Sequence, residues 1–200
     1  GFTGVNKEDT DMVPVLTEIA AGSPGALFFP IFQPAGDFVA DQAPGVSGLE
    51  GVVLLGADGL QVQTFMELPQ ANGMYLSGPD LRYGSNTNQS TGATADKFLA
   101  DYESNNGNAP EAPFWAHSYD ATTILLEAIK AASHSHDGNL EIDRAGVREY
   151  LDNLSGYEGI IGTLSCDDFG DCGAQRITVV QNNSADFAAS IENVVFSFAP

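Results

Sequence analysis

Three short apolar runs in the first half of the chain lack the alternation of a half-exposed strand. They are Ala26–Phe32, Val52–Gly56 and Met74–Ser77. Strands that are apolar on both faces are typical of a parallel sheet covered by helices. Segments with a helical pattern lie between them, at Ala35–Gln42 and Thr64–Gln70. This alternation predicts βαβ crossovers and an open α/β sheet.

Helix signals precede and follow this region. Asp11 can cap a first helix, Pro14 falls in its first turn, and Gly22 follows its last apolar residue. A polar stretch at Gly84–Thr94 reads as a loop or hinge. Beyond it, the apolar spacing predicts helices at Ala95–Ser104, Ser118–Ser133 and Asp143–Leu154. The remaining apolar segments predict strands at Gly159–Ser165, Arg176–Gln181 and Asn193–Ala199.

The net charge narrows the classes of partner. The chain has 27 acidic and 7 basic residues, a formal charge of −20. Such a field repels phosphate, which argues against nucleic acid and anionic membrane surfaces as partners. No apolar run approaches the roughly 20 residues of a membrane span, so we expect no membrane insertion. The chain opens at Gly1 like the middle of a longer protein, and we expect this fragment to lack its signal sequence.

The two cysteines, Cys166 and Cys172, lie close together in the segment CDDFGDC. This spacing suits a small disulfide-closed loop, whereas a zinc site needs four ligands and closer cysteine pairs. We therefore predict a disulfide, which indicates an oxidising, extracytoplasmic compartment. His134 and His136 could bind a metal weakly, but the polar segment SHSHDG favours a solvated loop.

The sequence contains no recognisable catalytic motif. The nucleophile elbow GxSxG, the metalloprotease motif HExxH, the phosphate-binding P-loop and the dinucleotide motif GxGxxG are all absent. His117 lies near a helix start, and we expect it to serve the helix or the core; a pairing with a serine and a distant aspartate is the alternative. The run at Asp167–Asp171 lacks the spacing and final glutamate of a calcium loop. We predict no catalytic residue, no metal and no cofactor.

Candidate ligand-binding residues follow the predicted strands, because ligands of open α/β sheets bind beyond the carboxyl ends of the strands. Asp58 follows the strand Val52–Gly56, with Ala57 before it and Gly59 after it. A glycine lets the backbone approach a ligand. Burial of a ligand ammonium group requires a paired carboxylate, which Asp58 could supply. The alternative for Asp58 is a plain turn residue.

Several segments together resemble one family. In chain order they are NKEDTDMVPVLTEIAAGSPGALFFPIFQP, LLGADGL, GMYLSGP, KFLADYESNNGNAPEAPFWAHSYDATTILLEAIKAA and RAGVREYLDNLSGYEGIIGTLSCDDFGD. The chain resembles the C-terminal half of an extracellular solute-binding protein of the branched-chain amino acid ABC transporter type. The resemblance implies the type I periplasmic binding fold, with a three-layer α/β/α open sheet of mostly parallel strands. Members have two lobes and a longer chain, so this fragment would be lobe two plus some lobe-one elements.

The resemblance also implies a division of the chain. Residues 1–108 would form the α/β portion of lobe two. Residues 109–170, with helices 118–133 and 143–154, would cross to lobe one, and residues 171–200 would supply closing strands that return to lobe two or the hinge. Without the rest of lobe one, we expect the two helices to expose apolar surface or to bury it by self-association.

Family positions match the candidate site residue by residue. The resemblance places Asp58 where members hold the ligand amine, and it places Phe32 and Gln33 where members set an aromatic ring against the ligand. Gln33 would be a polar substitution at this position, which argues against a pocket lined only by aliphatic side chains. Core packing is the alternative for Phe32. Groups that bind the ligand carboxylate would lie in the missing lobe.

We therefore expect a non-enzymatic protein that binds a small polar solute, most simply an amino acid, between two closing lobes. It would deliver this ligand to the permease of a membrane ABC transporter. The protein itself would be extracytoplasmic, either periplasmic or a cell-surface lipoprotein. The runner-up is a sensory ligand-binding domain of the same fold. The alternative from another class is a secreted α/β hydrolase that uses Asp58 or His117.

Overall fold

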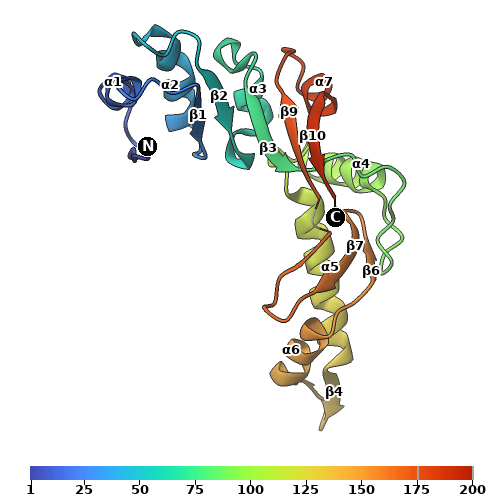
Figure 1. Ribbon diagram of the computed structural model, residues 1–200. Helices are drawn as coiled ribbons and strands as arrows, with labels where there is room; N and C mark the ends of the chain where they lie inside the picture. Colours follow the sequence, from blue (N-terminus) through green and yellow to red (C-terminus); the bar gives the residue numbers. More distant parts are fainter. Residues whose placement is uncertain (175, 200) are drawn as a thin grey trace. The chain divides into compact units, whose positions relative to one another are not determined.

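The computed structural model describes residues 1–174 and 176–199. The chain divides into two compact units, each built from segments that are separate in the sequence, and Figure 1 labels their elements. Unit 1 comprises residues 1–81, 111–113 and 176–200, and unit 2 comprises residues 82–110 and 114–175. Residues 82–108, which we assigned to the first portion from the sequence, lie in unit 2. The match between units and lobes stays a prediction.

Unit 1 is built on a five-stranded sheet in the order β1-β2-β3-β9-β10 (Figure 1). The strands are β1 (Ala26–Phe29), β2 (Val53–Gly56), β3 (Tyr75–Pro79), β9 (Ile177–Gln181) and β10 (Val194–Phe198). β1, β2 and β3 run parallel, as their uninterrupted apolar patterns predict. β9 pairs antiparallel with β3, and β10 pairs antiparallel with β9. The sheet is therefore a mixed one, and its two antiparallel pairings, β3 with β9 and β9 with β10, lie at one side.

Short helices precede and connect these strands. They are α1 (Val13–Ala20), α2 (Ala35–Gln42), α3 (Gln63–Met66) and α7 (Phe187–Glu192), with 3₁₀ turns η1 (Ala43–Gly45), η2 (Asp58–Leu60) and η3 (Pro69–Ala71). The N-cap of α1 is Met12, with no side-chain capping bond, rather than Asp11 as expected. Asp11 precedes it and accepts a hydrogen bond from the backbone N of Val13 at 3.1 Å. The bounds of α2 are the predicted ones, whereas the pattern that predicted a helix at Thr64–Gln70 forms α3 and η3. α7 was not predicted.

The core of unit 1 fixes the turn that follows β2. Leu60 is fully buried and packs on two glycines: a Cβ on Gly36 would lie 2.6 Å from Leu60 Cδ2, and one on Gly56 would lie 3.2 Å from Leu60 Cδ1. The absence of side chains on α2 and β2 at these points makes room for Leu60. Burial of such a side chain contributes about 1.5–3 kcal/mol. Leu60 thus anchors η2, the turn that begins at Asp58.

Unit 2 has its own set of elements. These are α4 (Ala95–Asn106), α5 (Trp115–Ala131), the hairpin β4 (Ser133–His136) and β5 (Asn139–Ile142), α6 (Arg144–Asp152), and the sheet β6 (Tyr157–Gly159), β7 (Gly162–Cys166) and β8 (Cys172–Gly173). Asp143 caps α6 through the backbone N of Ala145, as predicted. The prediction that His134 and His136 lie in a loop is wrong. Both are exposed residues of β4, and each lies next to Glu141 of β5.

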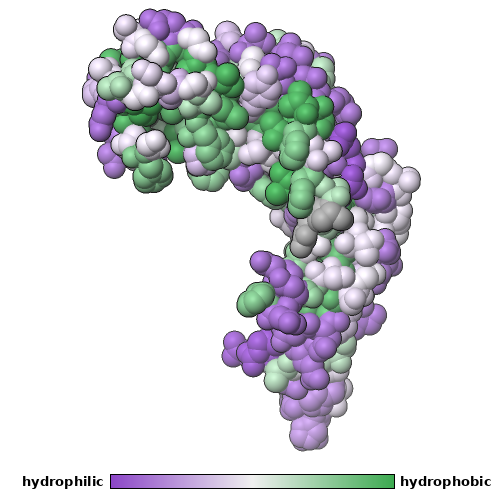
Figure 2. Space-filling view, viewed as in Figure 1, coloured by the Kyte–Doolittle hydropathy of each residue, from purple (hydrophilic) through white to green (hydrophobic). Residues whose placement is uncertain are grey.

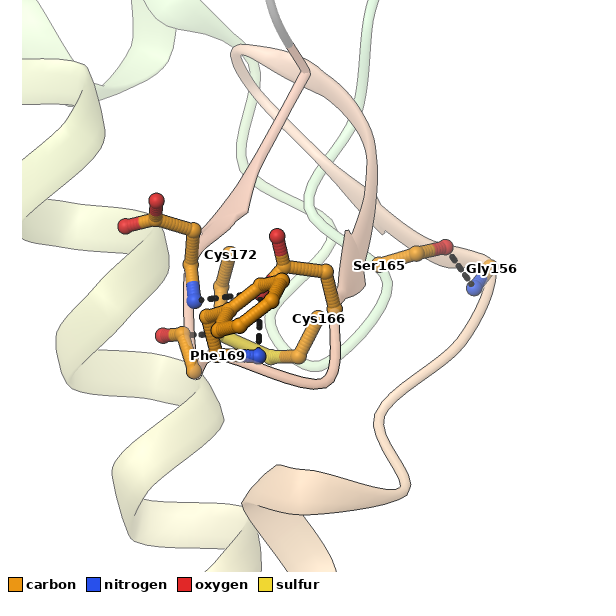
Figure 3. The surroundings of a disulfide bond; sticks show 8 residues. Gly156, Ser165, Cys166, Phe169 and Cys172 are labelled. Carbon is orange, nitrogen blue, oxygen red and sulfur yellow. Dashed lines mark hydrogen bonds between the residues drawn. A yellow bond between two sulfur atoms is a disulfide. The ribbon is translucent and has the colours of Figure 1, made fainter.

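The disulfide predicted from cysteine spacing is present (Figure 3). It joins Cys166 at the end of β7 to Cys172 in β8. The carboxylate of Asp167 accepts hydrogen bonds from the backbone N atoms of Phe169 and Asp171, at 2.9 and 3.0 Å. These contacts order the loop, and they leave the Phe169 ring 94% exposed.

Each unit exposes apolar side chains. In unit 1 they gather over β9 and β10 (Figure 2), where Ile177, Phe196 and Phe198 are each more than half exposed. In unit 2 they lie on α5 and β5, at Leu125, Leu126, Leu140 and Ile142. Within the described ranges, no helix combines the length and apolarity that a membrane crossing requires.

Candidate functional site

The carboxyl ends of β1, β2 and β3 lie at one edge of the sheet of unit 1, because the three strands are parallel. Phe32 follows β1, and the segment Ala57–Gly59 follows β2. A Cβ on Gly59 would lie 2.8 Å from Cδ1 of the Phe32 ring and 3.1 Å from the carbonyl oxygen of Ile31. The Phe32 ring therefore packs directly on Gly59, and the fold brings together four of the five residues that we predicted to bind ligand.

Phe32 does not belong to the core. Its side chain is 70% exposed, although the aromatic ring lies against Gly59. Exposure of a large aromatic side chain at the ligand-binding edge of a sheet is typical of a contact surface.

Asp58 carries an available carboxylate. It is the first residue of η2, and the backbone carbonyls of Ala57 and Asp58 accept hydrogen bonds from Leu60 and Gln61 at 2.9 and 3.0 Å. The side chain is half-buried, and its carboxylate has no hydrogen bond or ion pair with any residue that the structure describes. The turn is thus held by the backbone, while the charge stays free for another group.

The charges of unit 1 favour a cationic partner at this edge. Its basic side chains are Lys7 and Arg176. Lys7 pairs with Glu8 at 3.3 Å, and Arg176 pairs with Asp80 at 3.0 Å. In the described part of unit 1, no cation without an acidic partner stands ready for a ligand anion.

Gln33, the fifth predicted residue, has a structural partner for each polar atom. Its Nε2 donates to both carboxylate oxygens of Asp37, at 3.0 and 3.1 Å, and its Oε1 accepts from Thr64 Oγ1 at 2.6 Å. Burial raises the pKa of Asp37, and the bonds from Gln33 oppose this rise. Gln33 thus joins α2 to α3, and a direct contact with ligand stays a prediction.

Gln61 is a residue that the sequence reading missed. Its side chain is 1% exposed, and neither Oε1 nor Nε2 has a hydrogen-bond partner among the described residues. Leaving a buried amide unpaired costs about 1–3 kcal/mol. The only sequence signal was its position, three residues after Asp58 and directly after the turn.

His117 and the hairpin histidines form no recognisable reactive centre. His117 lies in the first turn of α5 and is half-buried, and its Nδ1 is buried without a hydrogen-bond partner among the described residues. Burial lowers the pKa of His117, and nearby Asp120 opposes this less strongly. In residues 1–174 and 176–199, no group of three or more histidine, cysteine, aspartate or glutamate side chains could hold a metal ion.

The comparisons with known proteins agree with this architecture. The family described as "Periplasmic binding protein" matches residues 2–186, nearly the whole chain. This chain belongs to the periplasmic binding protein family. The family and fold class predicted from the sequence are therefore confirmed. No curated protein matches the chain.

Three solved structures illustrate the structural likeness. A leucine binding protein, LivK, from Thermotoga maritima is 22% identical, with a TM-score of 0.68 over 98% of this chain. An amino acid ABC transporter substrate-binding protein from Pseudomonas fluorescens is 18% identical, with a TM-score of 0.64 over 99% of this chain. An ABC transporter solute binding protein from Rhodopseudomonas palustris, in complex with p-hydroxybenzoic acid, is 16% identical, with a TM-score of 0.61 over 88% of this chain.

The likeness covers only part of each of these longer proteins. The matched regions are 51%, 50% and 46% of the three structures, so this chain spans about half their length. At such identities the likeness shows the fold alone. The ligand must therefore be argued from the residues of this chain.

Proposed function

We propose that this chain is part of an extracytoplasmic solute-binding protein that carries an amino acid to the permease of an ABC transporter. The observation that supports this proposal most is the unpaired, half-buried carboxylate of Asp58 beside the exposed ring of Phe32. A non-enzymatic role is part of the proposal.

The chemistry of this edge suits an ammonium group. A carboxylate and an ammonium form a charge-assisted hydrogen bond, which is roughly twice as strong as a neutral one. An aromatic face beside the pair attracts the same cation and covers the apolar part of the ligand. Asp58 would bind the ammonium group, Phe32 would contact the ligand body, and Gly59 would let the two approach closely.

The same charges argue against an aromatic acid as the ligand of unit 1. One structural relative was solved with p-hydroxybenzoic acid, which has a carboxylate and no ammonium group. Asp58 would repel that carboxylate, and the described part of unit 1 presents no unpaired cation against it. The ligand carboxylate would bind to residues outside unit 1.

The lobe assignment belongs to this proposal. Strands β1, β2 and β3, from residues 1–81, share one sheet with β9 and β10 in unit 1. This supports the assignment of residues 1–81 and of the closing strands to lobe two. Helices α5 and α6 would belong to lobe one. The transporter role rests on the family, and the disulfide supports an oxidising compartment.

The test is Asp58→Asn in the full-length protein that carries these residues. Asparagine keeps the size of the side chain and removes its charge. Loss of one partner of a buried charge pair costs about 2–5 kcal/mol, or roughly 30-fold to several-thousand-fold in affinity. Calorimetric titration with a panel of L-amino acids measures the loss, after equal thermal midpoints have been checked.

The matched control is Asp41→Asn, which removes the same charge from an exposed position on α2. It should leave affinity unchanged. Equal affinities for wild type and Asp58→Asn would contradict the proposal and would reduce Asp58 to a turn residue.

A further inference from the structure

The five-stranded sheet of unit 1 is covered by helices of its own unit on one face only. Side chains alternate between the two faces of a strand. Phe29, Leu76 and Val180 point to one face, where they belong to a single buried core with residues of α1, α2, α3 and α7. Phe28 and Val179, their neighbours along β1 and β9, are not part of that core. The four helices that the structure describes in unit 1 therefore lie on the first face.

The second face, here called the outer face, is apolar and exposed. Its residues pair across the strands: Phe28 with Leu55, Val179 with Phe196, and Ile177 with Phe198. Figure 2 shows apolar side chains gathered over β9 and β10. A surface of this kind marks an interaction site in a soluble protein. Five large side chains of the outer face are between 42% and 59% exposed: Phe28, Val53, Ile177, Phe196 and Phe198.

Polar side chains in the middle of the sheet divide the outer face into two apolar patches. Tyr75 of β3 pairs with Leu55 on one side and with Gln181 on the other. Nε2 of Gln181 donates a hydrogen bond to the hydroxyl of Tyr75 at 3.2 Å. The first patch lies on β1 and β2 (Phe28, Val53 and Leu55), and the second lies on β9 and β10 (Ile177, Val179, Phe196 and Phe198).

The outer face carries no charged side chain, although the chain as a whole has a formal charge of −20. None of the five strands contains an acidic or basic residue. A sheet face that meets water usually presents polar side chains. A charged partner would find no ion pair here, whereas an apolar layer would remove both patches from water.

The dimensions of the sheet fit two helices side by side. Neighbouring strands lie about 4.8 Å apart, so the five strands span about 19 Å. Packed helices lie about 8–10 Å apart, which places two of them across that width. Strands of four or five residues are about 15 Å long, a length that about ten helical residues match.

We propose that the outer face binds two amphipathic helices from the part of the full-length protein outside residues 1–200, one helix on each apolar patch. This chain spans about half the length of the three matched structures, so a comparable length of chain remains to supply the helices. A segment of the same chain has a high effective concentration at this face, which favours it over a second copy. The inference goes beyond the proposed function and does not depend on the ligand or on Asp58.

Photocrosslinking of the full-length protein tests the occupant directly. The photoreactive residue p-benzoyl-L-phenylalanine replaces Phe28 in one variant and Phe196 in another. Each variant should crosslink within one chain to a peptide outside residues 1–200, and the two peptides should differ. The matched control has the same replacement at Phe169, which is also an exposed phenylalanine but lies in unit 2. The control should reach neither peptide.

The masses and positions of the crosslinks decide the result. A crosslinked product at twice the chain mass would show that a second copy covers the face, which overturns the proposal. Crosslinks that stay within residues 1–200, or that do not form, overturn it as well. So does a single peptide reached from both Phe28 and Phe196, or a control that reaches either peptide.

The stability of the full-length protein gives an independent measurement. Phe196→Asp places a charge beneath the proposed helix and should lower the thermal midpoint by about 5 °C or more, because burial of an unpaired charge is costly. Thr17→Asp adds the same charge to an exposed position on α1 and should have little effect. If Phe196→Asp does not fold, Phe196→Ser replaces it in the comparison. Equal midpoints for the variants at Phe196 and Thr17 would show that Phe196 is uncovered, which overturns the proposal.

Discussion

At the scale of residues, Asp120 of α5 is a buried carboxylate with a structural role. It is fully buried and accepts hydrogen bonds from the backbone N atoms of Ile160 and Ile161, at 3.0 and 2.9 Å, and from Asn88 Nδ2 at 2.9 Å. Tyr157 also bonds to Asn88, at 3.2 Å. One side chain thus holds the 85–94 loop and the β6–β7 turn on α5.

Asp120→Ala should therefore destabilise unit 2 strongly. The substitution leaves the buried N–H groups of Ile160 and Ile161 without an acceptor and removes one of the two acceptors of Asn88 Nδ2. Each unmet group costs about 1–3 kcal/mol. We expect the free energy of unfolding to fall by at least about 3 kcal/mol. Urea unfolding followed by the fluorescence of Trp115, which lies in the same unit, measures it. Asp101→Ala is the control, because Asp101 is exposed. Equal midpoints for the two variants would contradict the structural role.

At the scale of elements, the disulfide joins β7 to β8 and closes the loop that carries Phe169. A disulfide stabilises the folded protein mainly because it restricts the unfolded chain, and for a loop this short the gain is about 2 kcal/mol. We expect reduction to lower the free energy of unfolding of unit 2 by that amount. Chemical unfolding with and without reductant measures the difference.

Two further measurements complete that prediction. Protein prepared without reductant should show no alkylated thiol by intact mass. The double variant Cys166→Ser and Cys172→Ser should be as unstable as the reduced protein and should not respond to reductant. Two labelled thiols in unreduced protein would contradict the prediction.

At the scale of the whole molecule, unit 2 exposes apolar side chains on α5 and β5. Leu125 and Leu126 of α5 are 44% and 59% exposed, Leu140 of β5 is 70% exposed, and no residue of α6 is fully buried. Monomeric proteins rarely leave large contiguous apolar surfaces uncovered. The sequence-based expectation for these helices was exposed apolar surface or self-association.

The 200-residue chain should accordingly self-associate as its concentration rises. Leu126→Glu should weaken this association at least several-fold, because it places a charge in the apolar surface. Light scattering over a concentration series measures the change. Thr17→Glu adds the same charge to an exposed position on α1 and should have little effect. A monomer at all concentrations, or equal effects of both variants, would contradict the prediction.

The sequence by itself determined those features that depend on neighbouring residues. Uninterrupted apolar runs indicated the parallel strands β1, β2 and β3, and cysteine spacing indicated the disulfide. The strand ends indicated Asp58, because parallel strands bring their carboxyl ends to one edge whatever lies between them. Phe32 was indicated by the family resemblance, and the role of both residues in binding stays a prediction. Periodicity and spacing are local signals, so they survive without knowledge of the complete chain path.

The tertiary structure alone decided which distant segments meet. β9 adds to β3 across about half the chain, Gln33 is bonded to Thr64, and Gln61 reaches Gly78. The sequence pattern around Gln33 and Gln61 says only that they are polar and near strand ends. Whether a polar side chain finds a partner depends on atoms that tertiary packing brings within about 3 Å. Packing therefore bonded both polar atoms of Gln33 and left the carboxamide of Gln61 without a hydrogen-bond partner among the described residues.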